Sequence, residues 1–156
     1  RVHRHRLRLL LGAGGNTFAD TLGWQSKNLI MASIRNGSES LMLWNLALNG
    51  SGGPHYGACG TRCNGVLQIE GSSVTKNADY AVLGHVSQFV SPGAKVLQTK
   101  QSTDRVENVA FVNPNGGRVM VLANYNSSTK QVAIQEGGRA LNLVLAAGSL
   151  STVTWR

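Results

Sequence analysis

The sequence has few cysteines, few prolines and no long apolar run. Its 156 residues include only 2 Cys and 3 Pro. Two cysteines cannot form a disulfide-dense scaffold or a four-cysteine zinc site. No apolar run approaches the about 20 residues that a membrane-spanning helix needs. Apolar residues nevertheless make up 42% of the chain, which predicts a folded core instead of a disordered polymer.

Acidic residues are also scarce, at 7 against 15 Lys and Arg. Much of this imbalance lies at the start of the chain, where Arg1, Arg4, Arg6 and Arg8 occur without an acid between them. A nucleic-acid-binding arm would carry interleaved aromatic side chains that stack on bases, and this segment has none. We therefore treat residues 1–15 as an anomalous basic leader and expect no nucleic-acid partner.

Residues 16–91 have the order of an α/β unit. A capping box at Thr17 and Asp20 predicts a helix that continues to Asn36. The apolar run 40–48 predicts a fully buried strand of the kind found in parallel sheets. The glycine-rich segment 49–65 then predicts a loop at the carboxyl end of that strand, where barrel enzymes place their sites.

A small hairpin and a second helix are expected to complete this part. Residues 66–69 and 73–75 predict the hairpin. Asn77 is expected to cap a helix over 78–90, whose inward face would carry Tyr80, Leu83, Val86 and Val90.

Residues 92–156 follow a different pattern, with short β-branched segments separated by turn clusters. The segments are 107–112, 118–123, 131–134, 141–145 and 149–155. Such spacing predicts an antiparallel β-sandwich. Alternation puts Phe111 and Val109 on one core-facing side, and Trp155 and Val153 on another.

The residues that carry chemistry in most enzymes form no catalytic set in this sequence. Asp20 and Asp79 are predicted to be first-turn helix acids, and no two carboxylates have the spacing of a general acid/base pair. His85 lies within the second helix and is predicted to be a packing residue. His55, in the glycine-rich loop, is a better candidate for ligand binding. No catalytic residue, metal site or cofactor is expected.

Cys59 and Cys63 lie in the same glycine-rich loop, separated by three residues. Two thiols and His55 do not complete a zinc site, so a short disulfide between them is predicted. N-glycosylation sequons at Asn36, Asn49 and Asn126 add mild support for a secretory context.

Trp44 is the most informative single residue for function. It could be a core residue of the apolar strand, or its indole face could stack on a sugar ring. In the second case Asn45, Asn49 and His55 would supply polar neighbours for the sugar hydroxyls.

Several ordered motifs resemble glycoside hydrolase family 30, which includes glucosylceramidases and endo-β-1,6-glucanases. They are the residues 44–49 (WNLALN), 52–54 (GGP), 80–90 (YAVLGHVSQFV) and 107–114 (ENVAFVNP), and the final strand ending in Thr154 and Trp155. The resemblance covers residues 16–156. It implies the C-terminal slice of a (β/α)8 TIM barrel followed by a β-sandwich side domain.

The resemblance also implies a retaining glycosidase whose two glutamates lie upstream of the last barrel strand. The nucleophile strand would fall around residues 3–8, where this sequence has no acid. We therefore expect a truncated or frame-shifted product that lacks both catalytic carboxylates and is inactive alone. Reading residues 1–11 in the other two frames would test the frameshift.

The resulting prediction is a C-terminal fragment of a secreted β-glycosidase, with a β-glucoside or β-glucan as substrate. Its missing barrel portion would be an intramolecular partner, because Leu41, Leu43 and Leu46 would be exposed without it. The alternative is a non-catalytic carbohydrate-binding or interaction module built on the sandwich. That alternative needs exposed aromatic side chains on the sandwich.

Overall fold

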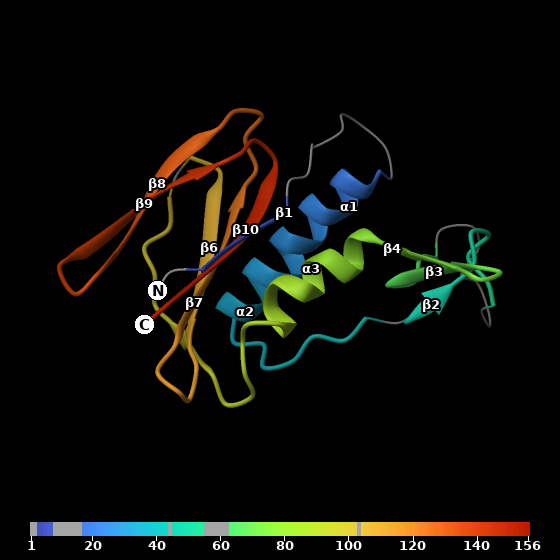
Figure 1. Ribbon diagram of the computed structural model, residues 1–156, viewed down its shortest axis with the longest axis horizontal. Coiled ribbons are helices and arrows are strands. Elements are labelled where there is room, and N and C mark those ends of the chain that lie inside the picture. The colour runs from blue at the N-terminus through green and yellow to red at the C-terminus, as the bar shows by residue number, and fades with distance from the viewer. Residues whose placement is uncertain (1–2, 8–16, 44, 55–62, 103) are drawn as a thin grey trace.

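A computed structural model describes residues 3–7, 17–43, 45–54, 63–102 and 104–156. These residues are arranged in layers (Figure 1): a β-hairpin, a five-stranded sheet, a layer of helices and a small three-stranded sheet.

The five-stranded sheet is the centre of the molecule. All its neighbouring strands are antiparallel. Its strands, in spatial order, are β1 (His3–Leu7), β10 (Ser149–Trp155), β7 (Arg118–Asn124), β6 (Val106–Val112) and β5 (Lys95–Leu97). The backbone of β1 therefore joins the basic segment at the start of the chain to the sheet.

One face of this sheet is covered by the hairpin of β8 (Lys130–Glu136) and β9 (Arg139–Leu145). Gly137 and Gly138 form its tight turn, and both have positive φ (54° and 78°), which suits a two-residue hairpin loop. The core between the two layers consists of Val106, Leu122, Ile134, Leu143, Leu145 and Val153. The predicted antiparallel sandwich is confirmed.

Helices cover the opposite face of the sheet (Figure 1). They are α1 (Phe18–Gln25), the π-helical η1 (Ser26–Ala32), the short α2 (Ser33–Arg35) and α3 (Ala78–Ser87). Alternate residues of β7 point to this layer, and they form one core with the buried side chains of the helices. The core includes Leu22, Met31, Val82, Val109, Phe111, Val119, Val121 and Leu150. Burial of the sheet on both faces explains why the central strand β7 has the nearly continuous apolar run 119–123.

The first predicted helix is confirmed, including its capping box, in which Asp20 N donates to the Thr17 hydroxyl. Helical spacing predicts a buried face with Phe18, Leu22, Leu29 and Ala32, but Phe18 is 42% exposed whereas Met31 is fully buried. The π-helical segment η1 explains part of the difference, since its wider turns rotate later residues relative to a regular α-helix.

The predicted buried strand over 40–48 is wrong in length and burial. Only β2 (Ala47–Leu48) is a strand; it pairs in parallel with β3 (Leu67–Glu70), which forms the predicted hairpin with β4 (Ser73–Lys76). Met42 is 93% exposed and Leu46 is 74% exposed. Leu48 is buried and Leu41 packs partly against the core, so only Met42 and Leu46 of the described apolar residues in this segment are exposed.

The helix α3 is confirmed; it buries Ala78, Asp79, Val82 and His85, and the predicted Val86 and Val90 pack partly buried against the core. Tyr80 is 38% exposed, which corrects its predicted burial. Asn77 stands at the N-cap position without a side-chain capping bond. No described helix is long and apolar enough to cross a bilayer.

Candidate functional site

The loop after β2 is organised by Asn49. Its Oδ1 accepts hydrogen bonds from Ser51 N (3.1 Å), Ser51 Oγ (2.9 Å) and Gly53 N (2.8 Å). Its backbone N–H donates to Gly53 O at 2.6 Å. An asparagine that accepts backbone donors two and four residues ahead is a turn-forming residue. Asn49 thus shapes the loop, and its acceptor oxygen is used within the loop.

Two further contacts hold this loop to the small sheet. Glu70 of β3 accepts a hydrogen bond from Gly50 N through Oε1. Asn77 donates from Nδ2 to Gly65 O (2.8 Å), so its side chain supports the strand connection instead of capping α3. These bonds give Asn77 and Glu70 structural roles. Their positions in the sequence did not reveal these roles.

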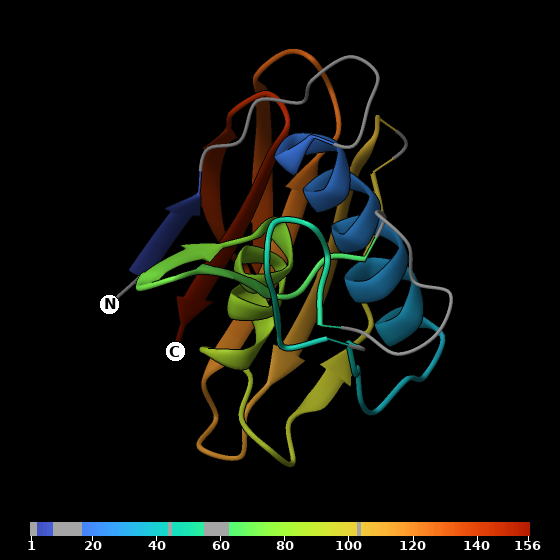
Figure 2. The same cartoon turned by 90° about the vertical axis from the view of Figure 1, so that its right-hand side faces the viewer.

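A groove of about 330 Å³ lies between the small sheet and α3. Figure 2 shows β3, β4 and the segment around β2 in front of α3. The described lining residues are mainly apolar: Leu46, Val66, Leu67, Tyr80, Leu83, Gly84, Ser87 and Gln88. Among them there is no carboxylate, histidine or cysteine, so this groove can bind apolar groups but offers no general acid or base.

Of the four residues predicted to contact a sugar, the structure describes Asn45 and Asn49. Asn45 accepts a hydrogen bond from Val66 N at its carbonyl oxygen (3.0 Å), directly beside the groove residue Leu46. Asn49 follows β2 on the same segment. Trp44 and His55 lie outside the described residues, so their predicted contact with a sugar stays a prediction.

The structure describes only one of the two cysteines of the predicted disulfide. Cys63 is disulfide-bonded. Cys59 lies outside the described residues, and the pairing of these two cysteines stays a prediction. Among the described side chains, no group of three or more His, Cys, Asp and Glu is placed to hold a metal ion.

The carboxylates of the sandwich and its helices have structural partners. Asp79 is buried and accepts a hydrogen bond from Gln25 Nε2 (2.5 Å), which joins α3 to α1. Asp104 pairs with Lys130 Nζ (2.7 Å). Glu136 accepts from Arg118 Nε (2.8 Å) and Trp155 Nε1 (2.7 Å); the Arg118 bond is the main reason that its pKa is lowered. These carboxylates stabilise the fold.

His85 is confirmed as a packing residue. It is buried, and its Nδ1 lies 2.8 Å from Thr152 Oγ1 of β10. The Thr152 hydroxyl also lies 3.1 Å from the carbonyl oxygen of His85. The two contacts attach α3 to the middle of the sheet.

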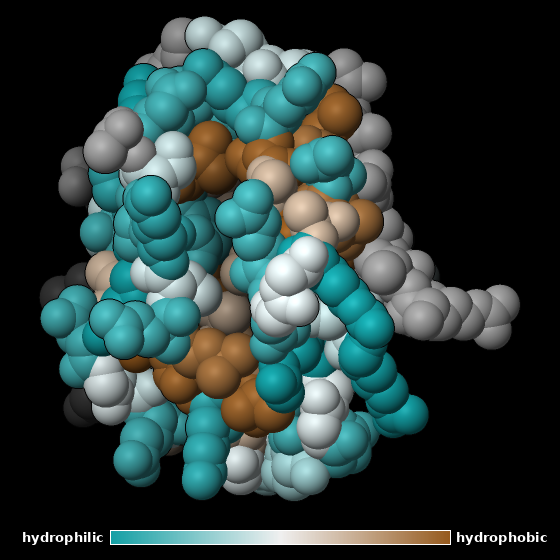
Figure 3. All heavy atoms as spheres, turned by 90° about the vertical axis from the view of Figure 1, so that its left-hand side faces the viewer, coloured by the Kyte–Doolittle hydropathy of each residue, from teal (hydrophilic) through white to brown (hydrophobic). Residues whose placement is uncertain are grey.

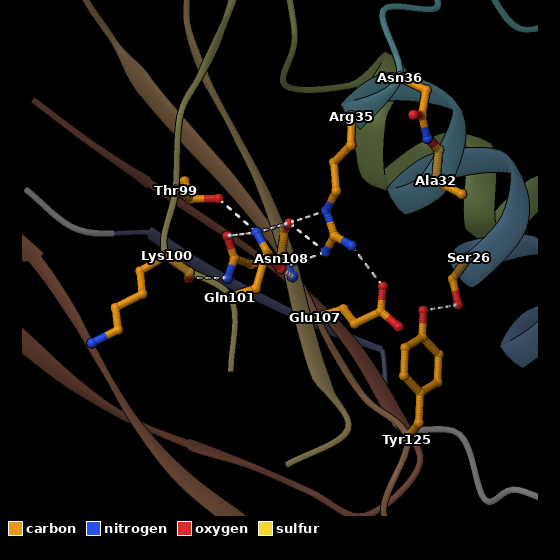
Figure 4. Close-up of polar contacts among 10 residues, drawn as sticks. All are labelled: Ser26, Ala32, Arg35, Asn36, Thr99, Lys100, Gln101, Glu107, Asn108 and Tyr125. Carbon is orange, nitrogen blue, oxygen red and sulfur yellow. Dashed lines mark hydrogen bonds and ion pairs between the residues drawn. The ribbon is translucent and has the colours of Figure 1, made fainter. Parts of the chain in front are cut away.

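Sequence reasoning missed a polar network that attaches the first helix to the sheet (Figure 4). Arg35 reaches Glu107 Oε2 with Nη1 (2.8 Å) and Gln101 Oε1 with Nη2 (2.6 Å). In the middle of the same helical segment, where η1 begins, Tyr125 Oη lies 3.3 Å from Ser26 Oγ. Burial raises the pKa of Tyr125 to about 12, while the Ser26 bond acts in the opposite direction. The partners of Arg35 are about seventy residues distant, so no local sequence pattern reveals them.

The outer face of the hairpin offers little to a carbohydrate. Figure 3 shows it as mainly hydrophilic, with separated brown patches. Phe111 is 4% exposed. Trp155 packs against the sandwich core and donates its indole N–H to Glu136. As predicted, both aromatic residues belong to core faces, which leaves them unavailable as a flat sugar-binding pair.

Comparisons with known proteins agree with this architecture. Residues 93–153 match the glycosyl hydrolase family 30 beta sandwich domain. The chain is 32% identical over 107 residues to the endo-1,6-beta-D-glucanase neg1 of Aspergillus fumigatus, a match that covers 64% of this chain. It is 31% identical over 116 residues to the lysosomal acid glucosylceramidase of Mus musculus, covering 72% of this chain. Each match spans only 22% of the relative.

Two solved structures extend the agreement to most of the chain. SrfJ from Salmonella typhimurium superposes with a TM-score of 0.84 at 26% identity, covering 93% of this chain and 32% of that protein. An endo-beta1,6-glucanase superposes with a TM-score of 0.79 at 27% identity, covering 86% of this chain and 30% of that protein. The chain belongs to glycoside hydrolase family 30 and corresponds to a C-terminal portion of its members.

Proposed function

We propose that this chain is part of a retaining β-glycosidase that hydrolyses β-glucosidic bonds in a β-glucan or β-glucoside. Support comes from the relatives, which are named endo-1,6-beta-D-glucanases and a glucosylceramidase. Retaining enzymes need two carboxyl groups about 5–5.5 Å apart. Six of the seven acidic side chains have structural partners, Glu39 being the exception, and we infer that the two catalytic groups come from a portion of the enzyme outside this sequence. The chain alone is inactive.

The observation that carries this proposal is the apolar surface around β2. Met42 and Leu46 are 93% and 74% exposed, and Leu46 also lines the groove beside α3. Exposed apolar residues that gather beside a groove mark a binding surface. The short parallel pair of β2 and β3 stands at this place. We assign the surface to a (β/α)8 barrel, of which residues 16–91 supply the last helix–strand–helix slice, with residues 92–156 as the side sandwich.

In this arrangement the segment around β2 contributes to the substrate surface. Trp44 is proposed to stack on the glycone sugar, and Asn45 and His55 are proposed to bind its hydroxyl groups. Asn49 shapes the loop that follows β2, and the disulfide of Cys63 is proposed to limit the motion of the glycine-rich segment. The proposed location is extracellular, as such a disulfide persists in oxidising compartments.

The test has two parts. Coding DNA upstream of residue 1 is expected to encode the rest of the barrel with two glutamates, in frame or after a frameshift. The purified chain is expected to release no 4-nitrophenol from an aryl β-glucoside and no reducing sugar from a β-1,6-glucan. Turnover by the chain alone that is lost in Trp44→Ala would overturn the division of labour proposed here.

A matched pair of variants tests whether the apolar surface around β2, with Met42 and Leu46, is the docking surface for the rest of the barrel. Leu46→Asp is expected to reduce binding of an apolar fluorescent dye, because Leu46 lies in the exposed apolar surface. Val144→Asp is the control, since Val144 is 50% exposed on the outer hairpin, away from the groove. An equal effect of both variants would contradict a localised docking surface.

A further inference from the structure

Three Asn-X-Ser sequons offer sites for an N-linked glycan, and the structure distinguishes them. They begin at Asn36, Asn49 and Asn126. An asparagine side chain has two N–H donors. Glycosylation replaces one of them with a bond to a sugar carbon and leaves one donor. A native site can therefore keep only one of its Nδ2 hydrogen bonds after modification.

Asn126 uses both of its side-chain donors. Its Nδ2 lies 2.8 Å from Asp104 O and 3.0 Å from Asn124 Oδ1. The residue is half-buried, and Asn124 is 1% exposed. A glycan on Asn126 would break one of these bonds. It would also have to extend to the solvent from a half-buried side chain. The fold therefore disfavours modification at Asn126.

Asn36 has the opposite environment. It is exposed at the end of the first helix, and its Nδ2 donates one hydrogen bond of 2.8 Å, to Ala32 O in the preceding turn. Figure 4 shows the Asn36 side chain beside Ala32, above the helix end and away from the Arg35 network. One N–H remains for a glycan, and the helix-terminal bond can persist. Gly37 follows with φ 87°, so the sequon lies in a turn at the surface.

We propose that Asn36 is an N-glycosylation site and that Asn126 is left unmodified. The donor is a lipid-linked oligosaccharide diphosphate. The Asn36 Nδ2 forms a bond to the sugar C1, the bond from C1 to the diphosphate oxygen breaks, and the lipid diphosphate leaves with that electron pair. The proton lost from Nδ2 goes to a base on the transferase.

Asn49 has a structural role of its own, because it shapes the candidate substrate loop. Its sequon can be removed by Ser51→Ala. That change deletes the Ser51 hydroxyl bond but keeps the Ser51 and Gly53 backbone donors on Asn49 Oδ1. Ser38→Ala likewise removes the Asn36 sequon while keeping the Asn36 side chain and its bond to Ala32.

The experiment expresses the full chain behind a secretory leader in a eukaryotic host. The inference rests on the secretory location proposed above, but the supplied leader separates its failure from a wrong location. In the Ser51→Ala chain, the secreted protein is expected to carry one glycan that peptide N-glycosidase removes. Peptide mapping should place that glycan at Asn36. Adding Ser38→Ala should abolish it, whereas Ser38→Thr should keep it.

The same samples give the results that would overturn the inference. An unoccupied Asn36 in the Ser51→Ala chain would overturn it, and so would a glycan at Asn126 in the secreted protein. If the chain is retained inside the cell, Asn36 occupancy is read in the retained pool. Occupancy there supports the site, and its absence contradicts it.

Discussion

Arg35 donates two hydrogen bonds to the carbonyl oxygen of Asn108, from Nε at 3.0 Å and from Nη2 at 2.7 Å. A residue at the end of the helix layer is thereby fixed to the backbone of β6. Asn108 is in turn held by Gln101, whose Oε1 accepts from Asn108 N at 3.2 Å. The contact joins two residues that are 73 positions apart in the sequence, and no local pattern links them.

Replacing Arg35 with Met should lower the free energy of unfolding by about 1.5–3 kcal/mol, since bonds to a charged donor are lost. Chemical denaturation measures the change. Glu107→Gln is the control, because it removes only a partly exposed ion pair. Such a pair is worth about 0–1 kcal/mol and weakens with salt. A Glu107→Gln effect as large as that of Arg35→Met would contradict the leading role of the Asn108 carbonyl.

Gly65→Ala should destabilise the protein. A Cβ at Gly65 would lie 2.5 Å from Leu67 O and 2.7 Å from Leu48 N, both backbone atoms that cannot turn aside. We expect a loss of about 1–3 kcal/mol, as for other overpacked sites. The melting temperature reports it.

Gly84→Ala is the matched control within α3. There a Cβ would meet only the flexible Gln88 side chain, at 3.4 Å. Alanine favours a helix interior over glycine by about 0.5–1 kcal/mol, so this variant should gain stability. Equal losses in both variants would show that crowding at Gly65 is not the cause.

Tyr125 should make stability fall at alkaline pH. Burial raises its pKa from 10.0 to about 12, so the unfolded chain loses the phenol proton first. The stabilising contribution is complete below pH 10 and is lost as the pH rises toward about 12. Denaturation curves across this range should show the loss. Tyr125→Phe should flatten this part of the profile; an unchanged slope would assign it to other groups.

Leu46 and Leu48 lie two positions apart, but polar substitution should change the free energy of unfolding much less at Leu46 than at Leu48. Leu46→Ser should alter the free energy of unfolding by only about 0.5 kcal/mol and reduce self-association, because the side chain is 74% exposed. Leu48→Ser should cost about 2–5 kcal/mol, since Leu48 is 4% exposed. Denaturation and sedimentation measure the two effects. A wild-type chain that is monodisperse and monomeric would contradict the proposal that the exposed apolar surface around β2 is a docking surface without its partner.

Local patterns predicted the sandwich well. The strands β6, β7 and β10 alternate between two cores, and β8 and β9 alternate between one core and solvent. Gly137 and Gly138 mark a turn that positive φ permits. The capping box at Thr17 and Asp20 was equally local, because both partners lie in one turn. Such features depend on neighbours within a few residues.

The burial of the α/β part could not be predicted in the same way. Leu46 is apolar like a core residue, yet its exposure depends on which other elements are present to cover it. The inward side of α3 depends on the sheet against which it packs, as the contact between His85 and Thr152 shows. Asn49 was identified as a site residue, but its loop-shaping bonds depend on backbone geometry that composition does not specify.

The position of β10 has a consequence for synthesis of the protein. It follows the other strands of the sheet in the chain, yet it lies between β1 and β7. On the ribosome, β7 must therefore wait with an open, apolar edge until residues 149–155 emerge. Premature stop codons before this strand would leave that edge permanently unpaired, and the nascent chain would depend on chaperones during the delay.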